Sequence, residues 1–390
     1  MGKIWNMPYR ELYNRYMESA IRGRYLTLNN ILPLLKEHST TARVILIGES
    51  VNGLPLLAYQ IGNGTVKILM WSQMHGNEST GTKALFDLFN LLGDDSELSR
   101  ALTSRFTFCI VPMLNPDGAL AYTRENANGI DLNRDFHNLT QPESKALTEI
   151  FEQFEPDYCY NIHDQRTIFG VGNPPNPATL SFLAPAFNQA RDINACRQKA
   201  VDVIVAMNRA LQGLMPGHIG RFDDTFNINC VGDNFQFRGV PTILIEAGHY
   251  PQDYDREQTR FYFFASLIAG FMFLIENDIV VNAIDEYLNI PQNKVVFFDF
   301  VYRNVNINYD GIEKITNFAA QYKEELVGDS LQLNAYIVEV GALQDHLGHI
   351  ELDGHGKPFD NNGMSFPEIG QKANFSIGND VKIVNGLKKM

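Results

Sequence analysis

The sequence contains few cysteines, and their placement argues against a disulfide or cysteine-based zinc framework. Only four of the 390 residues are cysteine. Cys109, Cys159, Cys196 and Cys230 lack the paired spacing of such a framework, and two of them lie in apolar, strand-like runs. We therefore expect reduced cysteines, most of them packed in the core.

Positive charge is also scarce. Lys and Arg number 32 while Asp and Glu number 45, so the formal net charge is −13. A chain this acidic has no bulk attraction for phosphate backbones or anionic membrane surfaces. Neither nucleic acid nor a membrane is therefore expected as a partner.

No apolar run reaches the length of a membrane span. The longest runs from Phe261 to Ile275 between Arg260 and Glu276, whereas a spanning helix needs about 20 residues. We expect a buried helix packed on a sheet. The first 24 residues are charged throughout and lack the apolar segment of a secretory signal. These features predict a soluble, cytoplasmic protein, and they leave its oligomeric state open.

Strand-like and helix-like segments alternate through most of the chain, which predicts an α/β fold. An Asn-Gly turn at Asn52-Gly53 indicates a hairpin over 43–61. Continuous apolar runs, typical of strands buried on both faces, occur at 67–74, 106–114, 156–162 and 241–248. Helical patterns occur at 8–38, 79–92, 141–154, 192–212 and 256–276. We expect a mixed, mostly parallel sheet flanked by helices.

The character of the sequence changes after about residue 289. Residues 295–311 and 331–343 have the composition of strands, and 348–380 is rich in Gly, Asp and Asn. The length also allows two domains. We therefore predict one domain over 1–289 and a small, strand-rich C-terminal domain over 290–390, whose role the sequence does not indicate.

The reactive residues of the first domain follow the predicted strands. His75 and Glu78 come directly after one strand, and Arg124 follows the next. His163 follows a third, and Glu246 ends a fourth. In an open α/β sheet, ligands bind outside the carboxyl ends of the strands. These five side chains are therefore expected at one edge of the sheet.

Three of these residues form a candidate metal site. His75 and Glu78 are three residues apart at a strand end and a helix start, where they can converge on one ion. His163 would complete a set of two histidines and one carboxylate, which leaves a zinc position open for water. Taken alone, the His-x-x-Glu spacing is equally compatible with a hydrogen-bonded core histidine.

The motifs occur as an ordered set, and as a set they resemble the M14 zinc carboxypeptidase family. The resemblance covers roughly 40–280 and includes the entry hairpin at 47–62. Its motifs are HGNE (75–78), LNPDG (114–118), TRENANGIDLNRDF (123–136), NIHDQ (161–165) and TILIEAG (242–248).

The resemblance implies a zinc-dependent metallopeptidase that removes a C-terminal residue from a peptide. In that scheme one Zn²⁺ is held by His75, Glu78 and His163. Glu246 is the general base that activates a zinc-bound water, and Arg124 polarises the scissile carbonyl. The remaining matches are Asn133 and Arg134, which grip the terminal carboxylate, and Asp131, which orients the first zinc histidine.

Two departures from the family pattern leave the substrate open. The family usually has a tyrosine on a loop shortly before the general base, but none occurs here between Tyr160 and Tyr250. The nearest aromatic candidates, Phe222 and Phe226, have no hydroxyl group. The usual Asn-Arg-Asn reads Asn-Arg-Asp, ending at Asp135, and a carboxylate there could alter the grip on a plain C-terminus.

These departures keep an alternative open: a zinc amidase or deacylase acting on cell-wall peptides or N-acyl amino acids. A third hypothesis is a ligand-binding relative without catalysis, which the presence of all the proposed catalytic groups disfavours.

The predicted C-terminal domain contains a second cluster of histidines and carboxylates. It comprises His346, His349, Glu351, Asp353 and His355. Glycines at 348, 354 and 356 favour a polar turn between short strands, and the order of possible ligands matches no familiar closed metal site. We therefore interpret this cluster as structural.

Overall fold

The computed structural model describes residues 8–276 and 282–389, and these form two compact units. The first unit ends at Asn293 and excludes Thr167–Gly170, which belong to the second unit together with the chain from Lys294 onward. The sequence pattern placed a domain boundary at 289/290 and gave no sign that Thr167–Gly170 would join the later residues.

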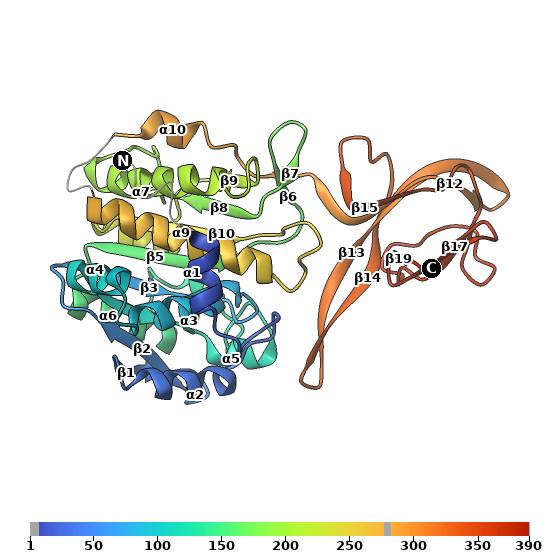
Figure 1. The fold of residues 1–390 in the computed structure, drawn as a ribbon. Helices are drawn as coiled ribbons and strands as arrows, with labels where there is room; N and C mark the ends of the chain where they lie inside the picture. The colour runs from blue at the N-terminus through green and yellow to red at the C-terminus, as the bar shows by residue number, and fades with distance from the viewer. Residues whose placement is uncertain (1–7, 277–281, 390) are drawn as a thin grey trace. The chain divides into compact units, whose positions relative to one another are not determined.

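A mixed eight-stranded sheet forms the centre of the first unit (Figure 1). The four central strands, β4, β3, β5 and β10, run parallel, while β2 and β8 pair antiparallel on either side. In sheet order the strands are β1 (Arg43–Glu49), β2 (Pro55–Ile61), β4 (Phe106–Val111), β3 (Val66–Trp71), β5 (Tyr158–Asp164), β10 (Thr242–Ala247), β8 (Leu180–Leu183) and β9 (Ile219–Arg221). The carboxyl ends of the parallel strands therefore meet at one edge, as expected.

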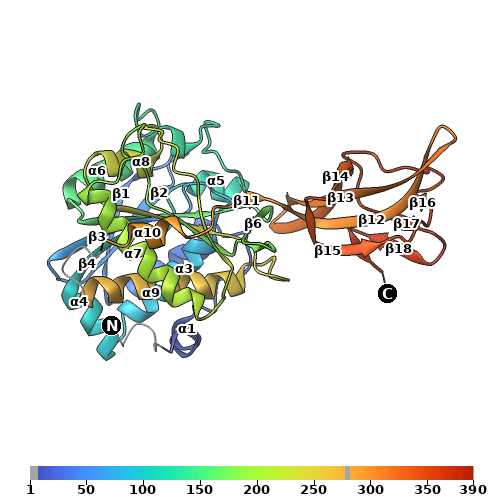
Figure 2. The same ribbon diagram turned by 90° about the horizontal axis from the view of Figure 1, so that it is seen from above.

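Helices cover both faces of this sheet (Figure 2). Because strand side chains alternate, Ile68 and Met70 join one apolar cluster while Leu69 and Trp71 join the other. The first cluster includes α1 (Tyr9–Tyr16), α2 (Leu28–His38), α3 (Thr80–Leu92), α4 (Glu97–Arg105), α7 (Ala195–Gln212), α9 (Glu257–Glu276) and α10 (Ile284–Leu288). The second includes α6 (Pro142–Phe154) and α8 (Val231–Phe237). Two short helical segments, α5 (Pro116–Ala121) and η1 (Leu132–Arg134), lie in the connection after β4.

Helix α9 contains the longest apolar run. Its length and composition would allow it to cross a membrane, but 83% of the relevant window is buried inside the fold. A core helix of a globular domain has the same properties, so the predicted buried helix is confirmed. Its polar start is also buried, because Arg260 donates two hydrogen bonds to Asp87 of α3.

Two predicted elements differ in extent from those observed. The helical pattern over 8–38 is divided into α1 and α2, because the connecting segment is tied to α9: Arg260 donates to the carbonyls of Glu18 and Ile21. The strand predicted to end at residue 74 ends at Trp71, since Gln73 has a left-handed φ of 51°. The earlier end leaves a longer loop for His75.

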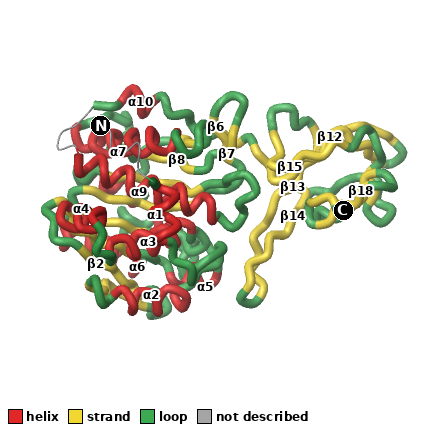
Figure 3. The backbone as a smooth tube through the Cα atoms, viewed as in Figure 1, coloured by secondary structure: helices red, strands yellow, loops and turns green. Residues whose placement is uncertain are grey.

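The second unit is built from strands, and its described residues contain no helix (Figure 3). One sheet has the order β14 (Ser330–Gly341), β13 (Ile312–Val327), β12 (Phe297–Tyr309), β15 (Leu347–Asp353). A smaller sheet contains β16 (Phe359–Asp360), β17 (Phe375–Ile377), β18 (Val381–Val384) and β19 (Leu387–Lys388). The remaining short strands of the chain are β6 (Phe169–Val171), β7 (Asn176–Pro177) and β11 (Lys294–Val295).

Aromatic and aliphatic side chains from both sheets, including Phe300, Phe318 and Phe375, form the core of the second unit. Strand β11 pairs with β6 through Lys294–Gly170 and Val295–Phe169.

Candidate metal centre

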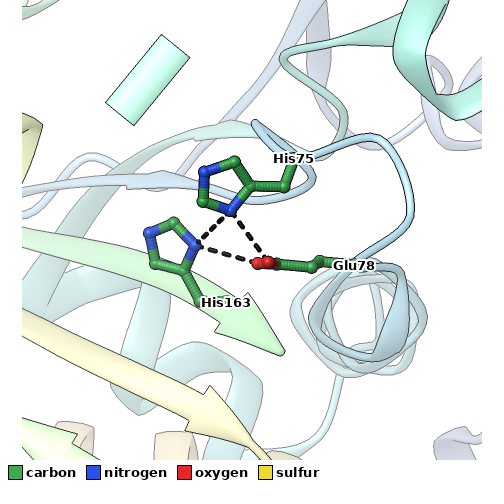
Figure 4. Close-up of side chains that lie close together, drawn as sticks. All are labelled: His75, Glu78 and His163. Atoms are coloured by element: carbon green, nitrogen blue, oxygen red, sulfur yellow. Dashed lines mark hydrogen bonds and ion pairs between the residues drawn. The ribbon is translucent and has the colours of Figure 1, made fainter. Parts of the chain in front are cut away.

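Three side chains converge at the carboxyl edge of the large sheet. His75 and Glu78 lie in the loop between β3 and α3, and His163 lies near the end of β5 (Figure 4). His75 and His163 are almost fully buried, and Glu78 is nearly so. His75 Nδ1 lies 2.9 Å from Glu78 Oε1 and 3.2 Å from His163 Nδ1. The distance from His163 Nδ1 to Glu78 Oε2 is 3.0 Å. The three residues predicted as metal ligands are therefore brought together.

The donor atoms have the spacing that one small cation requires. They all lie within 4.8 Å of one another. Ligand atoms about 2.0–2.1 Å from a tetrahedral zinc ion are about 3.3 Å apart, close to the separations found here. Two imidazole nitrogens and a carboxylate also suit zinc chemically. The residues therefore fit a divalent cation.

A backbone crossing explains the glycine that follows His75. The loop carrying His75 passes against the first turn of α5, and a Cβ built on Gly76 would lie only 1.9 Å from the carbonyl carbon of Gly118. No side chain can be accommodated at that distance. Glycine at 76 therefore allows the connections after β3 and β4 to meet directly beside the centre.

Asp131 and Arg124 form a second layer of polar groups around these side chains. His75 Nε2 lies 3.0 Å from Asp131 Oδ1, so the imidazole can donate there while its Nδ1 faces the other two ligands. Arg124 donates from Nε to Asp131 Oδ2 at 3.1 Å and from Nη1 to Glu78 Oε1 at 3.1 Å. Asp131 also accepts from the Asn133 backbone N–H. The predicted contact between Asp131 and His75 is present, and the same carboxylate also caps the short turn that begins at Leu132.

Burial and neighbouring charges shift the pKa values of all three side chains. Burial lowers the pKa of His75, but the Glu78 and Asp131 carboxylates more than offset this effect and raise it to about 9. Burial raises the pKa of Glu78, yet His75 and His163 hold it well below its usual range. Burial lowers the pKa of His163.

Glu246 lies beside His163 in the sheet. In the parallel register of β10 and β5, Glu246 is the direct partner of His163, so both side chains leave the same face at the same level. Burial, together with the negative charge of Glu78, raises the pKa of Glu246 to about 8. A cation held by the three ligands would favour its ionised form.

A buried arginine connects the ends of these two strands. Arg256 donates from Nη1 to the Ala247 carbonyl at 2.6 Å and from Nη2 to the Gln165 carbonyl at 2.9 Å. Its backbone has a left-handed φ of 60°. Arg256 has no distinguishing signal in the sequence, since an arginine before a helix normally indicates a solvated position.

Asn133 and Arg134 contact the residues at the start of α8. Asn133 Oδ1 accepts from the Val231 N–H at 3.0 Å, and Arg134 Nη1 donates to Cys230 Sγ at 3.2 Å. Arg134 is exposed. Its positive charge helps to lower the pKa of Asp131, which places it within electrostatic range of the ligands.

Asp135 does not have the role suggested by its sequence position. It is buried, with Oδ1 accepting from the N–H and hydroxyl of Thr140 and Oδ2 accepting from the Gln141 N–H. Both oxygens therefore stabilise the turn before α6. The expectation that this carboxylate alters the grip on a substrate is wrong.

The His-rich cluster of the second unit has local partners. Glu351 forms an ion pair with Arg303, and His349 Nε2 lies 2.8 Å from the Thr167 carbonyl while its ring stacks on Phe297. Asp353 accepts from the His355 N–H. Within residues 8–276 and 282–389, no metal-binding group other than that of His75, Glu78 and His163 is found.

Comparison with known proteins points to a single family. Residues 29–164 match the zinc carboxypeptidase family, Peptidase_M14. Carboxypeptidase SOL1 of Arabidopsis thaliana is 33% identical over 146 residues, which cover 32% of this chain and 30% of that protein. Carboxypeptidase 2 of Trichophyton tonsurans is 27% identical over 132 residues, covering 33% of this chain and 24% of the relative. The matched stretches thus span less than a third of these relatives' length.

Solved structures with the same fold cover more of the chain. A metallo-carboxypeptidase from Burkholderia cenocepacia superposes with a TM-score of 0.52 and 18% identity, covering 64% of this chain and 69% of the other. Carboxypeptidase A from Helicoverpa armigera gives a TM-score of 0.52 and 17% identity, covering 69% and 80%. The family match over residues 29–164, the fold and the donor geometry therefore agree in one likeness, that to the M14 zinc carboxypeptidases.

Proposed function

We propose that the chain is a zinc-dependent metallopeptidase of the carboxypeptidase type, which hydrolyses the last peptide bond of a substrate with Glu246 as general base. The observation that carries this proposal is the convergence of His75, Glu78 and His163 within 4.8 Å, with Glu246 in register beside His163. The family match ends at residue 164, so the role of Glu246 rests on this register.

A zinc ion at these ligands would supply Lewis acidity, lowering the pKa of a water and polarising a carbonyl next to it. Glu246 accepts a proton from the attacking water, whose oxygen adds to the carbonyl carbon. The carboxylic acid then returns this proton to the amide nitrogen, so that the C–N bond breaks and an amine leaves. Burial raises the pKa of Glu246 while a cation at the ligands would lower it, and an intermediate pKa suits a group that must both accept and donate a proton.

Arg124 is proposed to stabilise the oxyanion that develops on the scissile carbonyl. Its guanidinium is 40% exposed and already contacts Glu78, so it reaches the centre and retains an open side. A positive charge placed where negative charge develops is commonly worth about 10²–10³ in rate.

Arg134 and Asn133 are proposed to bind the terminal carboxylate of the substrate. An exposed guanidinium can form two parallel charge-assisted hydrogen bonds with a carboxylate. Asn133 can add its Nδ2 donor, because its Oδ1 already accepts from Val231.

The test is a pair of variants assayed on free and amidated peptides, with zinc content measured alongside. Glu246→Gln should retain zinc and lose at least about 10³-fold in kcat on every substrate. Arg134→Ala should raise KM for peptides with a free C-terminus and hardly affect amidated ones. Full activity of Glu246→Gln would exclude the general-base role, and equal losses of Arg134→Ala on both substrates would exclude docking.

The alternative retains the same centre and changes the substrate. It is a zinc amidase or deacylase acting on cell-wall peptides or N-acyl amino acids, and the missing tyrosine between Tyr160 and Tyr250 favours it. Asp135, the second departure from the family pattern, does not support this alternative, because its oxygens accept hydrogen bonds within the fold. Faster hydrolysis of N-acyl amino acids or muramyl peptides than of blocked dipeptides would select this alternative. A cytoplasmic location and the absence of membrane and nucleic-acid partners remain predictions.

A further inference from the structure

One buried side chain below the metal centre has no hydrogen-bond partner. Asn161 is fully buried on β5, and neither its Oδ1 nor its Nδ2 is paired with any described group. An amide placed in such surroundings loses its hydrogen bonds to water and normally has a replacement in the protein. An unpaired donor and acceptor on one side chain therefore indicate a position where a ligand or water completes the bonding.

Strand geometry places Asn161 under the reactive row. It precedes His163 by two residues, so both side chains leave the same face of β5, about 7 Å apart along the strand. In the sheet register its partners are Trp71 of β3 and Leu244 of β10. The row Trp71–Asn161–Leu244 thus lies one step below His163 and Glu246.

Helix α8 approaches the amide at a glycine. A Cβ built on Gly232 would lie 3.5 Å from Asn161 Nδ2 and 3.0 Å from Pro185 Cγ. A side chain at position 232 would therefore cover the amide. Trp71 Nε1 is a second buried donor without a partner in the described part of the chain, so two of the three side chains in this row present unpaired polar atoms.

The row has no charged member. Asp233, the residue after Gly232 in α8, accepts at Oδ1 from the Asn227 N–H. A charged substrate side chain would lose its hydration without gaining a counter-ion from this row. A neutral group with one donor and one acceptor matches the Asn161 amide instead.

We infer that Asn161 determines substrate specificity by binding a neutral, hydrogen-bonding side chain of the residue released, with a carboxamide (Gln or Asn) as the best match. This inference rests on the proposed carboxypeptidase function and names its substrate class. The scissile bond lies at the level of His163 and Glu246, and the side chain of the released residue descends to the row below.

The experiment compares blocked peptides whose C-terminal residues are nearly equal in shape: Gln against Met, and Asn against Leu. The zinc-loaded wild-type protein should favour Gln and Asn by at least about tenfold in kcat/KM, because a site built for hydrogen bonding is left unpaired by an apolar side chain. Asn161→Leu should abolish or reverse both preferences while zinc content stays unchanged.

Tyr160→Phe is the matched control. Tyr160 also has a buried, unpaired hydroxyl, but it lies on the opposite face of β5 among the residues of the other core. Its removal should leave the preferences unchanged. Asn161→Ser keeps a hydrogen-bonding group and serves as the second variant if Asn161→Leu does not fold; it should reduce the preference without reversing it.

The inference is overturned if wild-type protein prefers Met and Leu, if charged residues are released fastest, or if the Gln preference survives in Asn161→Leu. A loss of zinc in Asn161→Leu would also overturn it, since the side chain would then support the metal ligands. If zinc-loaded protein hydrolyses no peptide at all, the proposed function fails and the inference falls with it.

Discussion

Histidines and carboxylates cluster in two regions of the chain, the edge of the large sheet and residues 346–355 of the second unit. Only at the edge of the large sheet do their side chains converge on a common point. The donors at the edge of the large sheet come from the loop after β3 and from the end of β5, with His75 and His163 separated by 88 positions in the chain. The cluster of the second unit lies within ten consecutive residues along and after β15. Glu351 and Asp353 are two positions apart on β15 and leave the same face, but each is engaged locally, Glu351 with Arg303 and Asp353 with the His355 N–H. Convergence of several strand ends, rather than density in the sequence, creates the metal geometry.

The largest expected difference concerns the ligands themselves. His163→Ala should abolish stoichiometric zinc binding and reduce kcat/KM by at least about 10³-fold, more than the 10–100-fold typical of outer contacts. His349→Ala should leave both values unchanged and cost stability only, through its contacts with Thr167 and Phe297. Elemental analysis measures the zinc content of the two variants, and peptide hydrolysis measures their kcat/KM. Zinc loss from His349→Ala would break the distinction between the two regions.

A smaller effect should arise from the carboxylate behind His75. Asp131→Asn removes the charge that faces His75 Nε2 at 3.0 Å, and we expect zinc affinity to fall about 10- to 100-fold. Competition with a chelator measures the affinity. Glu351→Gln is the control in the second unit, because it weakens a comparable arginine contact to a carboxylate that contacts none of the three proposed ligands. An unchanged zinc affinity in Asp131→Asn would mean that Asp131 stabilises only the turn in which it accepts from the Asn133 N–H.

The smallest effect concerns stability and pH, where the two regions should differ in sign. Burial raises the pKa of Asp233 to about 7, so the folded state binds its proton more tightly than the unfolded state. This contribution to stability is fully present below about pH 4 and is lost as pH rises through 7. Hydrogen bonds from His355 and Asn304 lower the pKa of Asp353, so its contribution is present above about pH 4 and is lost as pH falls.

Denaturant titrations at pH 5 and pH 8 test this contrast. Asp233→Asn should gain stability relative to wild type at pH 8, by on the order of 1–3 kcal/mol, and gain less at pH 5. Asp353→Asn should show no gain at pH 8. A gain for Asp233→Asn that does not depend on pH would mean that this carboxyl titrates normally in the folded protein.

Much of the fold and of the ligand set was predictable because both follow local patterns. Apolar runs such as 106–114 identify buried strands, and the polar residues after them identify the edge where ligands collect. Residues that act through long-range partners were not predictable. The pairing of Gly170 with Lys294, more than a hundred residues away, has no local signal, and nothing near Asp135 distinguished a turn-forming carboxylate from one that faces a substrate.

Asn161 is an intermediate case. It lies in the apolar run PDYCYNI, where a polar residue is unusual, and two positions before a proposed ligand. Strand periodicity alone would have placed it on the face of His163. That it lacks a partner could only be learned from the packing around it.

The bridge made by Arg256 has a practical consequence for inhibitor design. Its guanidinium donates to main-chain carbonyls that follow Glu246 and His163 in the chain. The main chain of the protein, and not a bound ligand, therefore fixes the separation of these two strand ends. A rigid compound shaped to that gap would pay little for reorganising its target. An inhibitor series can therefore keep one rigid group at the level of Glu246 and His163 and vary only the substituent directed at the row of Asn161.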